Sequence, residues 1–327
     1  MTGVADWTGE GMRAAEQFRE MAARSFPGVS PSYEALATAV AADADLCARL
    51  DARPPRERQP NLLLGALRWL GGPIGNPAAT LAWLRSHWDD VADVLATHRT
   101  QTNEASRTAT LLPLLAQVPG PLALIEVGAS AGLCLLPDRY AYRYRTADGV
   151  VEIGDAPLVL TCDVTGPAPL PAAVPRVVWR RGLDLHPLDA GSDDDARWLE
   201  ALVWPEQTAR FDVLHRALAI ARRDPPVVVE GDLLTGLAGL VHQAPVDATV
   251  VVMHSAVLAY LSTGDRLRFA DSLATLGREV VWIANEAPGI VVDVDAAGHD
   301  GQFVLTRDRV PVAWTGAHGA TLDWIAG

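Results

Sequence analysis

The sequence predicts an α/β protein in which an N-terminal helical domain precedes a Rossmann-like, mostly parallel sheet that carries an inserted β-hairpin. Three observations predict this fold. Apolar residues recur at three-to-four spacing through residues 8–118, which is the period of an amphipathic helix. From residue 122 onward, short apolar runs alternate with helical patterns, as in a parallel sheet with helical crossovers. The first of these runs ends in a glycine-rich turn, which favours a strand followed by a tight loop and a helix.

The apolar pattern in the first part of the chain predicts a bundle of helices, which forms the N-terminal domain, residues 1–118. Its helical patterns cover residues 13–25, 33–50, 61–70 and 78–96, with breaks at Pro54-Pro55 and Gly71-Gly72-Pro73. The following segment, residues 99–107, is unusually polar, and Thr102 or Asn103 is placed to cap the next helix. Asn103, Glu104 and Arg107 would then face the glycine-rich turn and bind substrate. A capped, solvated helix start explains the same residues without any function.

Residues 119–327 are expected to form the sheet domain. Its expected strands are the apolar runs 122–127, 177–185, 227–232, 248–253 and 279–284, separated by helical segments at 194–222, 233–242 and 264–276. Between about residues 138 and 175 the pattern changes to period-two alternation with the turn signal Asp148-Gly149, which predicts the inserted β-hairpin. The runs 303–305 and 310–314 predict a second antiparallel hairpin.

Composition excludes several classes of function. The formal net charge is −13 at pH 7, and all 27 basic residues are arginine. Without lysine the chain cannot form a lysine Schiff base or the lysine contact of a phosphate-binding loop. Dispersed acidic charge argues against nucleic acid or an anionic membrane as a partner. Three scattered cysteines, the lack of a signal peptide and the lack of an 18-residue apolar run predict a cytoplasmic protein. The histidines lack metal-binding spacing, so we expect no metal.

The loop from Glu126 to Gly132 carries the main functional signal. Gly128 and Gly132 lack a Cβ, so a ligand can lie against the backbone, and Glu126 can accept hydrogen bonds from its hydroxyl or ammonium groups. The loop is similar to the E-x-G-x-x-x-G loop of class I methyltransferases, which holds S-adenosylmethionine. It also fits the G-x-S-x-G nucleophile elbow, with Ser130 exposed, and in part the dinucleotide pattern G-x-G-x-x-G.

A further alternative is an ordinary strand-to-helix turn that needs glycine and binds nothing. The context of the loop separates the functional alternatives. A hydrolase elbow normally follows several strands of its sheet, but here the preceding residues look helical. The interpretation favoured is therefore a Rossmann-like class I methyltransferase sheet. In such open sheets ligands bind beyond the carboxyl ends of the strands. Five expected strands end in polar residues at this edge: Glu126, Asp184, Gly231-Asp232, His254-Ser255 and Asn285-Glu286.

The methyltransferase interpretation assigns a role to each of these residues. The expected cofactor-binding residues are Glu126, Gly128, Ala129, Ser130, Gly132, Asp184, Gly231 and Asp232, with Asp184 at the ribose and the Gly231-Asp232 pair at the adenine. His254 would be the catalytic base, assisted by Glu286, because histidine titrates near neutral pH. Ser255 and Asn285 would bind substrate. The alternative for His254 is a structural histidine that is hydrogen-bonded at the strand end.

Six separated motifs carry a resemblance to a known family. They are Pro60-Asn-Leu-Leu-Leu64, Arg99-Thr-Gln-Thr-Asn-Glu104, Glu126-Val-Gly-Ala-Ser-Ala-Gly-Leu133, Leu202-Val-Trp-Pro-Glu-Gln207, His254-Ser-Ala-Val-Leu-Ala-Tyr-Leu261 and Trp282-Ile-Ala-Asn-Glu-Ala-Pro-Gly289. Over nearly the whole chain they resemble domain-of-unknown-function family 2332. The resemblance implies a methyltransferase-like sheet in the C-terminal two-thirds and no particular reaction. Members usually carry Asn where this chain has Cys134.

The leading hypothesis is a methyltransferase that uses S-adenosylmethionine to modify a small polar molecule. A second hypothesis keeps the fold but not the cofactor, as in a cyclase or lyase that uses His254 and the carboxylates. A third is a non-catalytic binding protein on the same fold, which leaves a protein partner open. A hydrolase with Ser130 as nucleophile comes last.

Overall fold

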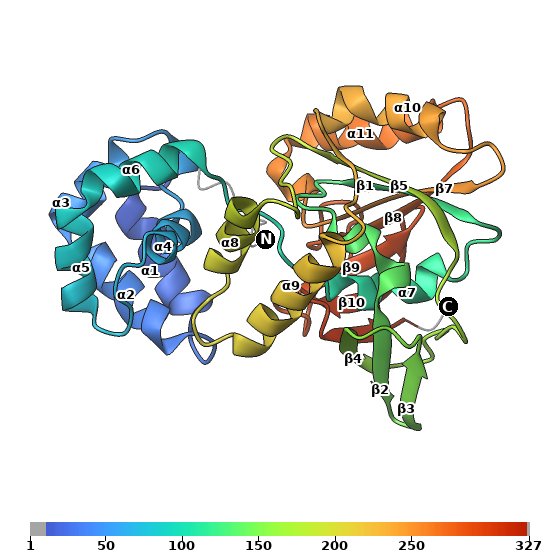
Figure 1. The fold of residues 1–327 in the computed structure, drawn as a ribbon, viewed down its shortest axis with the longest axis horizontal. Coiled ribbons are helices and arrows are strands. Elements are labelled where there is room, and N and C mark those ends of the chain that lie inside the picture. The colour runs from blue at the N-terminus through green and yellow to red at the C-terminus, as the bar shows by residue number, and fades with distance from the viewer. Residues whose placement is uncertain (1–10, 326–327) are drawn as a thin grey trace. The chain divides into compact units, whose positions relative to one another are not determined.

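Eleven strands of the described chain, residues 11–325, join one sheet in this computed structural model (Figure 1). The strands are β1 (Leu122–Val127), β2 (Ala141–Thr146), β3 (Gly149–Ile153), β4 (Val159–Thr165), β5 (Val177–Asp184), β6 (Val228–Glu230), β7 (Thr249–Ser255), β8 (Val280–Glu286), β9 (Gln302–Arg307), β10 (Val310–Gly316) and β11 (Thr321–Trp324). Their order is β3-β2-β4-β11-β10-β9-β8-β7-β1-β5-β6. Most neighbouring pairs are parallel, so the predicted α/β fold with a mostly parallel sheet is confirmed.

Five neighbouring strands, β6-β5-β1-β7-β8, form an all-parallel block. In the chain they occur as β1, β5, β6, β7 and β8, so the chain leaves β1 toward one edge and returns on its other side at β7. The position between β1 and β7 is therefore a topological switch point, where open α/β sheets bind ligands. β1 is buried along its whole length, which is why its sequence is an unbroken apolar run up to Glu126.

Helices α10 (Leu233–Gln243) and α11 (Thr263–Ala274) cover one face of this block (Figure 1). Their apolar side chains pack onto alternate residues of the strands, among them Ile125, Val252 and Ala284. Because side chains alternate along a strand, the residues between these positions point to the opposite face. Helix α7 (Arg107–Leu115) contacts β4 and β9 in the sheet.

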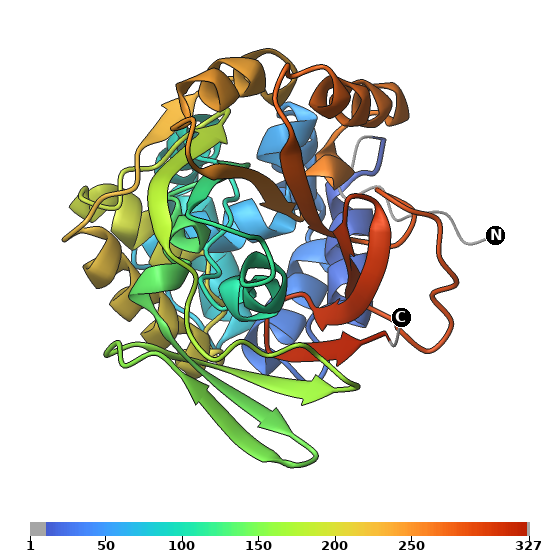
Figure 2. The same cartoon turned by 90° about the vertical axis from the view of Figure 1, so that its right-hand side faces the viewer.

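Two hairpins extend the parallel block, as expected. β2 and β3 pair antiparallel and form the inserted hairpin, drawn in green at the bottom of Figure 2. β9 and β10 pair antiparallel and form the second hairpin, which lies against β8. β4 follows the inserted hairpin and pairs parallel with both β2 and β11. The insertion therefore continues the same sheet.

The described chain divides into two compact units, called here the helical unit and the sheet unit. The helical unit ends at Asn103 and also takes in Asp193–His215, whereas the sheet unit comprises Glu104–Ser192 and the chain from Arg216 onward. The remaining helices are α1 (Ala14–Arg24), α2 (Pro31–Ala42), α3 (Ala44–Asp51), α4 (Pro60–Trp69), α5 (Pro77–Ser86), α6 (Trp88–Thr97), α8 (Asp193–Ala201) and α9 (Thr208–Ala221). Helix α7, on the N-terminal side of the predicted boundary at residue 118, belongs to the sheet unit.

Two of the expected helices are each divided in two. The span 33–50 breaks at Asp43, whose carboxylate accepts the backbone N–H of Leu46 and so caps α3. The span 78–96 breaks at His87. The cap expected at Thr102 or Asn103 is wrong, because the next helix begins only at Arg107. Asn103 instead donates to the backbone carbonyl of Leu199 within the helical unit, over 3.0 Å.

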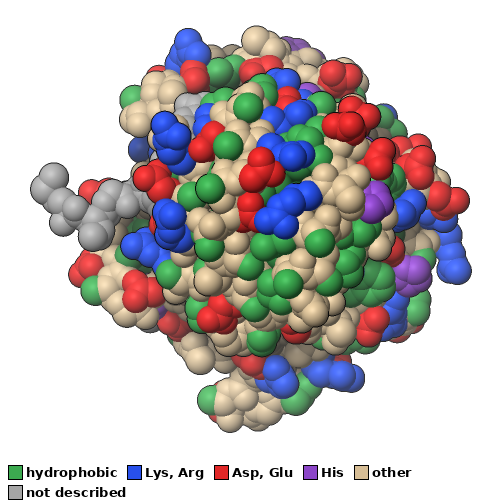
Figure 3. Space-filling model, turned by 90° about the vertical axis from the view of Figure 1, so that its left-hand side faces the viewer, with side chains coloured by type: hydrophobic (Ala, Val, Ile, Leu, Met, Phe, Trp, Pro, Cys, Tyr) green, Lys and Arg blue, Asp and Glu red, His purple; other side chains and the backbone are tan. Residues whose placement is uncertain are grey.

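The surface drawn in Figure 3 carries acidic and arginine side chains that are interspersed. Among the helices described, none is both long and apolar enough to cross a membrane.

Candidate functional site

The chain turns sharply after β1 through three residues in the left-handed backbone region: Gly128 (φ 69°), Ser130 (φ 53°) and Gly132 (φ 71°). The backbone N–H of Gly132 donates to the carbonyl of Ala129 over 2.7 Å and closes the turn. The helix expected after this loop is wrong, because two 3₁₀ turns, Leu133–Leu135 and Pro137–Arg139, follow in its place. Pro137 cannot donate a backbone hydrogen bond, so it does not continue the first turn as an α-helix.

The space beside the loop glycines is filled by the protein itself. A Cβ on Gly128 would lie 2.4 Å from Cγ2 of Val257, which follows β7. A Cβ on Gly132 would lie 2.6 Å from Cγ of Pro226. Both glycines therefore permit close packing of the loop, against a residue that precedes β6 in one case and against a residue that follows β7 in the other, where room for a ligand was expected.

Glu126 is the buried carboxyl group at the end of β1. Its side chain is 5% exposed, and its Oε2 has no hydrogen-bond partner in the described chain. Burial raises the pKa of Glu126 to about 8, although the thiol of Cys134 and the guanidinium of Arg107 oppose this shift. Oγ of Ser130, which is 1% exposed, likewise lacks a partner among the described residues. Two unsatisfied polar atoms thus lie within five residues of each other at the loop, where buried groups are normally paired.

The other expected cofactor-binding carboxylates are already engaged. Asp184 accepts the backbone N–H of Ser130 at Oδ2 and that of His186 at Oδ1, both over 2.8 Å. Asp232 caps α10 by accepting the N–H of Leu234 over 2.7 Å. Gly231 donates its N–H to the carbonyl of Asp184 over 2.9 Å. These residues hold the backbone at the ends of β5 and β6.

His254 lies on the face covered by α11, and both of its ring nitrogens are engaged. Nδ1 lies 2.7 Å from Oε1 of Glu286, and Nε2 accepts the indole N–H of Trp282 over 2.9 Å. The side chains of His254 and Glu286 are 0% and 1% exposed. The ring of Phe269, from α11, meets the imidazole edge-on at 5.7 Å. The arrangement favours a structural histidine, because neither nitrogen is free to take a substrate proton.

Ser255 and Asn285 point to the opposite face of the sheet. Nδ2 of Asn285 donates to Oγ of Ser255 over 3.1 Å, and its Oδ1 accepts the hydroxyl of Thr315 over 2.7 Å. Arg107 donates to the backbone carbonyl of Ser255 over 2.9 Å and lies over the ring of Phe303. The structure therefore separates the expected substrate residues from His254 by the thickness of the sheet.

Glu104 and Arg107 remain together in the sheet unit, on this second face. Glu104 is 4% exposed, and its Oε2 lies 3.3 Å from Nδ1 of His318. Its backbone carbonyl accepts the thiol of Cys134 over 3.5 Å. Arg107, Glu126 and Cys134 act on one another electrostatically. Together with Glu104, they form one buried polar cluster of four residues. Asn103, expected in the same group, belongs to the helical unit.

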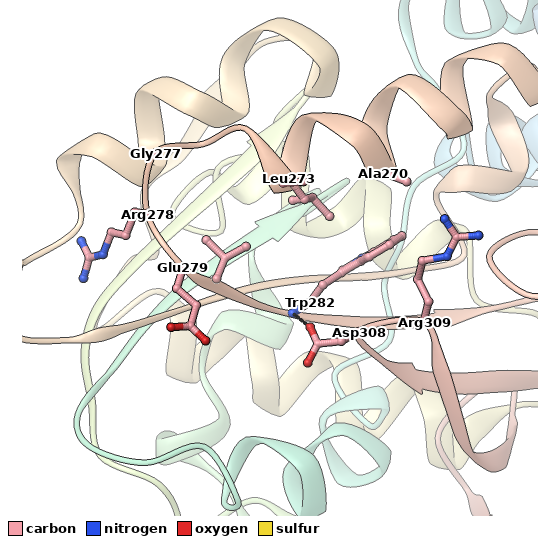
Figure 4. A pocket seen from close by; sticks show the side chains of 10 residues that line it. Ala270, Leu273, Gly277, Arg278, Glu279, Trp282, Asp308 and Arg309 are labelled. Atoms are coloured by element: carbon pink, nitrogen blue, oxygen red, sulfur yellow. Dashed lines mark hydrogen bonds between the residues drawn. The ribbon is translucent and has the colours of Figure 1, made fainter.

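A groove of about 500 Å³ lies at the amino end of β8, whereas Asn285 and Glu286 lie at its carboxyl end (Figure 4). It is lined by Leu273 of α11, by Trp282, and by Asp308 and Arg309 of the β9–β10 turn. The carboxylate of Asp308 accepts the backbone N–H of Trp282 over 2.9 Å. None of the expected site residues lines this groove.

Two residues that sequence reasoning missed shape the site. Val257 occupies the switch point. Trp282 holds the imidazole of His254 at Nε2, on the side of the ring away from Glu286. Both lie within the motifs of the family resemblance, His254–Leu261 and Trp282–Gly289. Neither is a polar residue at a strand end, which is the pattern by which the sequence predicts site residues.

Comparison with known proteins identifies the family. No curated protein matches the chain. The family described as an uncharacterized protein conserved in bacteria, DUF2332, matches residues 15–324. This match covers nearly the whole chain and both units. The chain therefore belongs to domain-of-unknown-function family 2332.

Proposed function

We propose that the sheet unit binds a small molecule at the switch point between β1 and β7, and that it acts as an S-adenosylmethionine-dependent methyltransferase. The observation that carries this proposal is the unsatisfied Oε2 of Glu126, a buried carboxyl group at the end of the central parallel strand. A buried polar group without a partner costs free energy, and a ligand that supplies the partner recovers it. The strand order supports the same reading, since β6-β5-β1-β7-β8 follows the doubly wound order 3-2-1-4-5.

The residues at the loop fit S-adenosylmethionine in part. The positive ammonium group of the ligand would favour the ionised form of Glu126, which carries a proton in the ligand-free protein, and Oγ of Ser130 offers a further polar contact. Asp184 and Asp232 would have to share carboxylates that already bind backbone N–H groups. Val257 occupies the space over Gly128 and would have to move. When bound, S-adenosylmethionine would supply an electrophilic methyl group on a sulfonium ion.

This chain would contribute positioning and exclusion of water. Holding a methyl acceptor against the donor can supply a large share of the rate enhancement. Arg107 is buried and acts on Glu126, and Glu104 is buried next to Cys134, so both are polar groups of the same cluster. The proposal does not depend on His254 as a base, because both of its ring nitrogens are engaged.

A second candidate is a non-catalytic binding protein, or an enzyme of another class, on the same fold. The observation that favours it is the closed state of the loop, where Val257 and Pro226 fill the space beside both glycines. In that case the protein binds a different small molecule or a protein partner, without S-adenosylmethionine.

Calorimetric titration with S-adenosylmethionine and with its demethylated product separates the two candidates. The proposal expects micromolar binding, at least tenfold weaker for Glu126→Gln, which keeps the shape of the side chain but cannot become an anion. Glu279→Gln, at the amino end of β8, is the matched control and should bind like the parent. No binding by the parent at millimolar cofactor would exclude the methyltransferase and leave the second candidate.

A further inference from the structure

The segment from Ala256 to Leu261, called here the latch, closes the switch point. It follows β7 directly and contains the 3₁₀ turn Leu258–Tyr260. Val257 is the residue of the latch that faces Gly128, with Cγ2 at 2.4 Å and Cγ1 at 3.0 Å from the position of a Cβ on that glycine. The side chain therefore lies where a ligand would have to contact the glycine loop.

The latch is held by its backbone from two sides. Oε1 of Glu286 accepts the N–H groups of Val257 over 2.8 Å and Leu258 over 3.1 Å. Arg266 of α11 donates to the carbonyls of Leu258 and Ala259, over 2.8 and 3.2 Å. His254 donates its Nδ1 proton to the same Oε1 atom of Glu286, because its Nε2 accepts from Trp282. The buried His254–Glu286 pair thereby positions the latch.

The closed latch also contains local strain. Ala256 has φ 58°, in the left-handed region that is unfavourable for residues with a Cβ. Its N–H donates to the carbonyl of Asn285 over 3.0 Å, which holds it in this conformation. Strained residues of this kind often mark segments that change conformation. The strain favours opening, and the hydrogen bonds to Glu286 and Arg266 oppose it.

We propose that the latch is a displaceable gate of the ligand site, and that a ligand contacts the glycine loop at Gly128 only when Val257 swings away from it. This inference rests on the proposed function for its ligand, but the gate itself belongs to the protein. A ligand that binds only the open form has its apparent affinity reduced by the fraction of molecules that are open. Changes that shift this fraction therefore change affinity without touching the ligand contacts.

Two neighbouring substitutions should act in opposite directions. Val257→Ala removes the methyl groups that face Gly128, destabilises the closed form and should tighten S-adenosylmethionine binding by roughly threefold to tenfold. Ala256→Gly relieves the left-handed strain of the closed form and should weaken binding by about threefold. Val246→Ala, at a residue that is 96% exposed before β7, is the matched control and should leave binding unchanged. Equal affinity in all four proteins would overturn the gate while the proposed function stood.

Amide hydrogen exchange tests the gate without any ligand. The N–H groups of Val257 and Leu258 should exchange faster than those of Val251 and Val252 within β7, because they open locally. Arg266→Gln should accelerate the first pair by about fivefold and leave the second pair unchanged. Equal protection of both pairs in the parent would show that the segment opens only on global unfolding and would overturn the proposal. Local opening without S-adenosylmethionine binding in any variant would retain the gate and exclude the methyltransferase.

Discussion

The indole N–H of Trp282 donates to Nε2 of His254, with 2.9 Å between the two nitrogen atoms. An indole nitrogen can only donate, so Nε2 must be the acceptor and the proton of the neutral ring lies on Nδ1. That proton faces Oε1 of Glu286 at 2.7 Å. The direction of both hydrogen bonds is thereby set by Trp282, and the histidine links β7 to β8 inside the protein.

Removing this donor should cost stability. Trp282→Phe leaves Nε2 of His254 buried without a partner, which should lower the free energy of unfolding by about 1–3 kcal/mol. Urea denaturation measures the change. Trp88→Phe is the control, since the ring of Trp88 lies under Arg49 in the helical unit. A loss at Trp282 no larger than that at Trp88 would contradict the structural role of the hydrogen bond.

A side chain on Gly128 should be destabilising in proportion to its contact with Val257. Gly128→Ala combines a left-handed backbone, which costs about 1–2 kcal/mol for a residue with a Cβ, with the clash against Val257. Gly120→Ala has a similar φ of 79° but only a 3.7 Å contact with Thr249, so it reports the backbone cost alone.

The double variant Gly128→Ala/Val257→Ala should recover part of the loss. Residues in contact show interaction energies of about 0.5–3 kcal/mol in double-mutant cycles. Thermal or urea unfolding of the four proteins gives this energy. Strict additivity would mean that the two side chains do not meet in solution.

The buried carboxyl group of Glu126 should make stability depend on pH. Its pKa of about 8 in the folded protein lies above its ordinary value of 4.5, so the folded state holds a proton that the unfolded state has lost. Its contribution is fully present below pH 4.5 and is lost as pH rises through about 8. Each unit of pKa difference corresponds to about 1.4 kcal/mol, so the total decline is on the order of a few kcal/mol.

Glu126→Gln should remove this part of the pH dependence, because the amide does not titrate. Urea midpoints between pH 5 and pH 9 should fall for the parent and stay flatter for the variant. The same slope in both proteins would place the titrating group elsewhere.

Glu206 should stabilise the helical unit by capping α2. Its Oε1 accepts the N–H of Ser32 over 2.8 Å, and its Oε2 accepts the hydroxyl of Ser30 at the N-cap. Glu206→Ala should cost about 1 kcal/mol, as for loss of a helix cap. Glu20→Ala, which breaks only the exposed pair with Arg24, should cost much less. Equal losses in urea denaturation would show that Glu206 contributes no cap.

Local sequence patterns predicted the strands well because a strand that is buried on both faces consists of consecutive apolar residues. The runs at Leu122–Val127 and Thr249–Ser255 are apolar for this reason, and the glycine turn after β1 follows from residues that tolerate left-handed backbone. The inserted hairpin was predictable from Asp148-Gly149 and from the alternation on either side. These features depend on neighbours in the chain.

The candidate site was harder to predict because its contacts are long-range. Val257 meets Gly128 across 129 positions of sequence, and no local pattern indicates which side chain fills a glycine's empty side. Alternation along β7 places His254 and Ser255 on opposite faces of the sheet. Neighbouring residues at a strand end therefore cannot all face one site, as had been expected. The helix expected after the loop failed because Gly132 adopts the left-handed region and Pro137 follows.

The pairing of β4 with β11 has a consequence for biosynthesis. Thr165 and Asp323 share a 2.7 Å hydrogen bond across 158 positions of sequence, so β4 emerges from the ribosome long before its partner strand exists. Until then β4 presents an open strand edge, and such edges invite pairing with other chains. Synthesis of β11 is therefore the step that joins β4 to β10, and shortening the chain before Thr321 should yield aggregation during synthesis even though every residue of the candidate site has already been made.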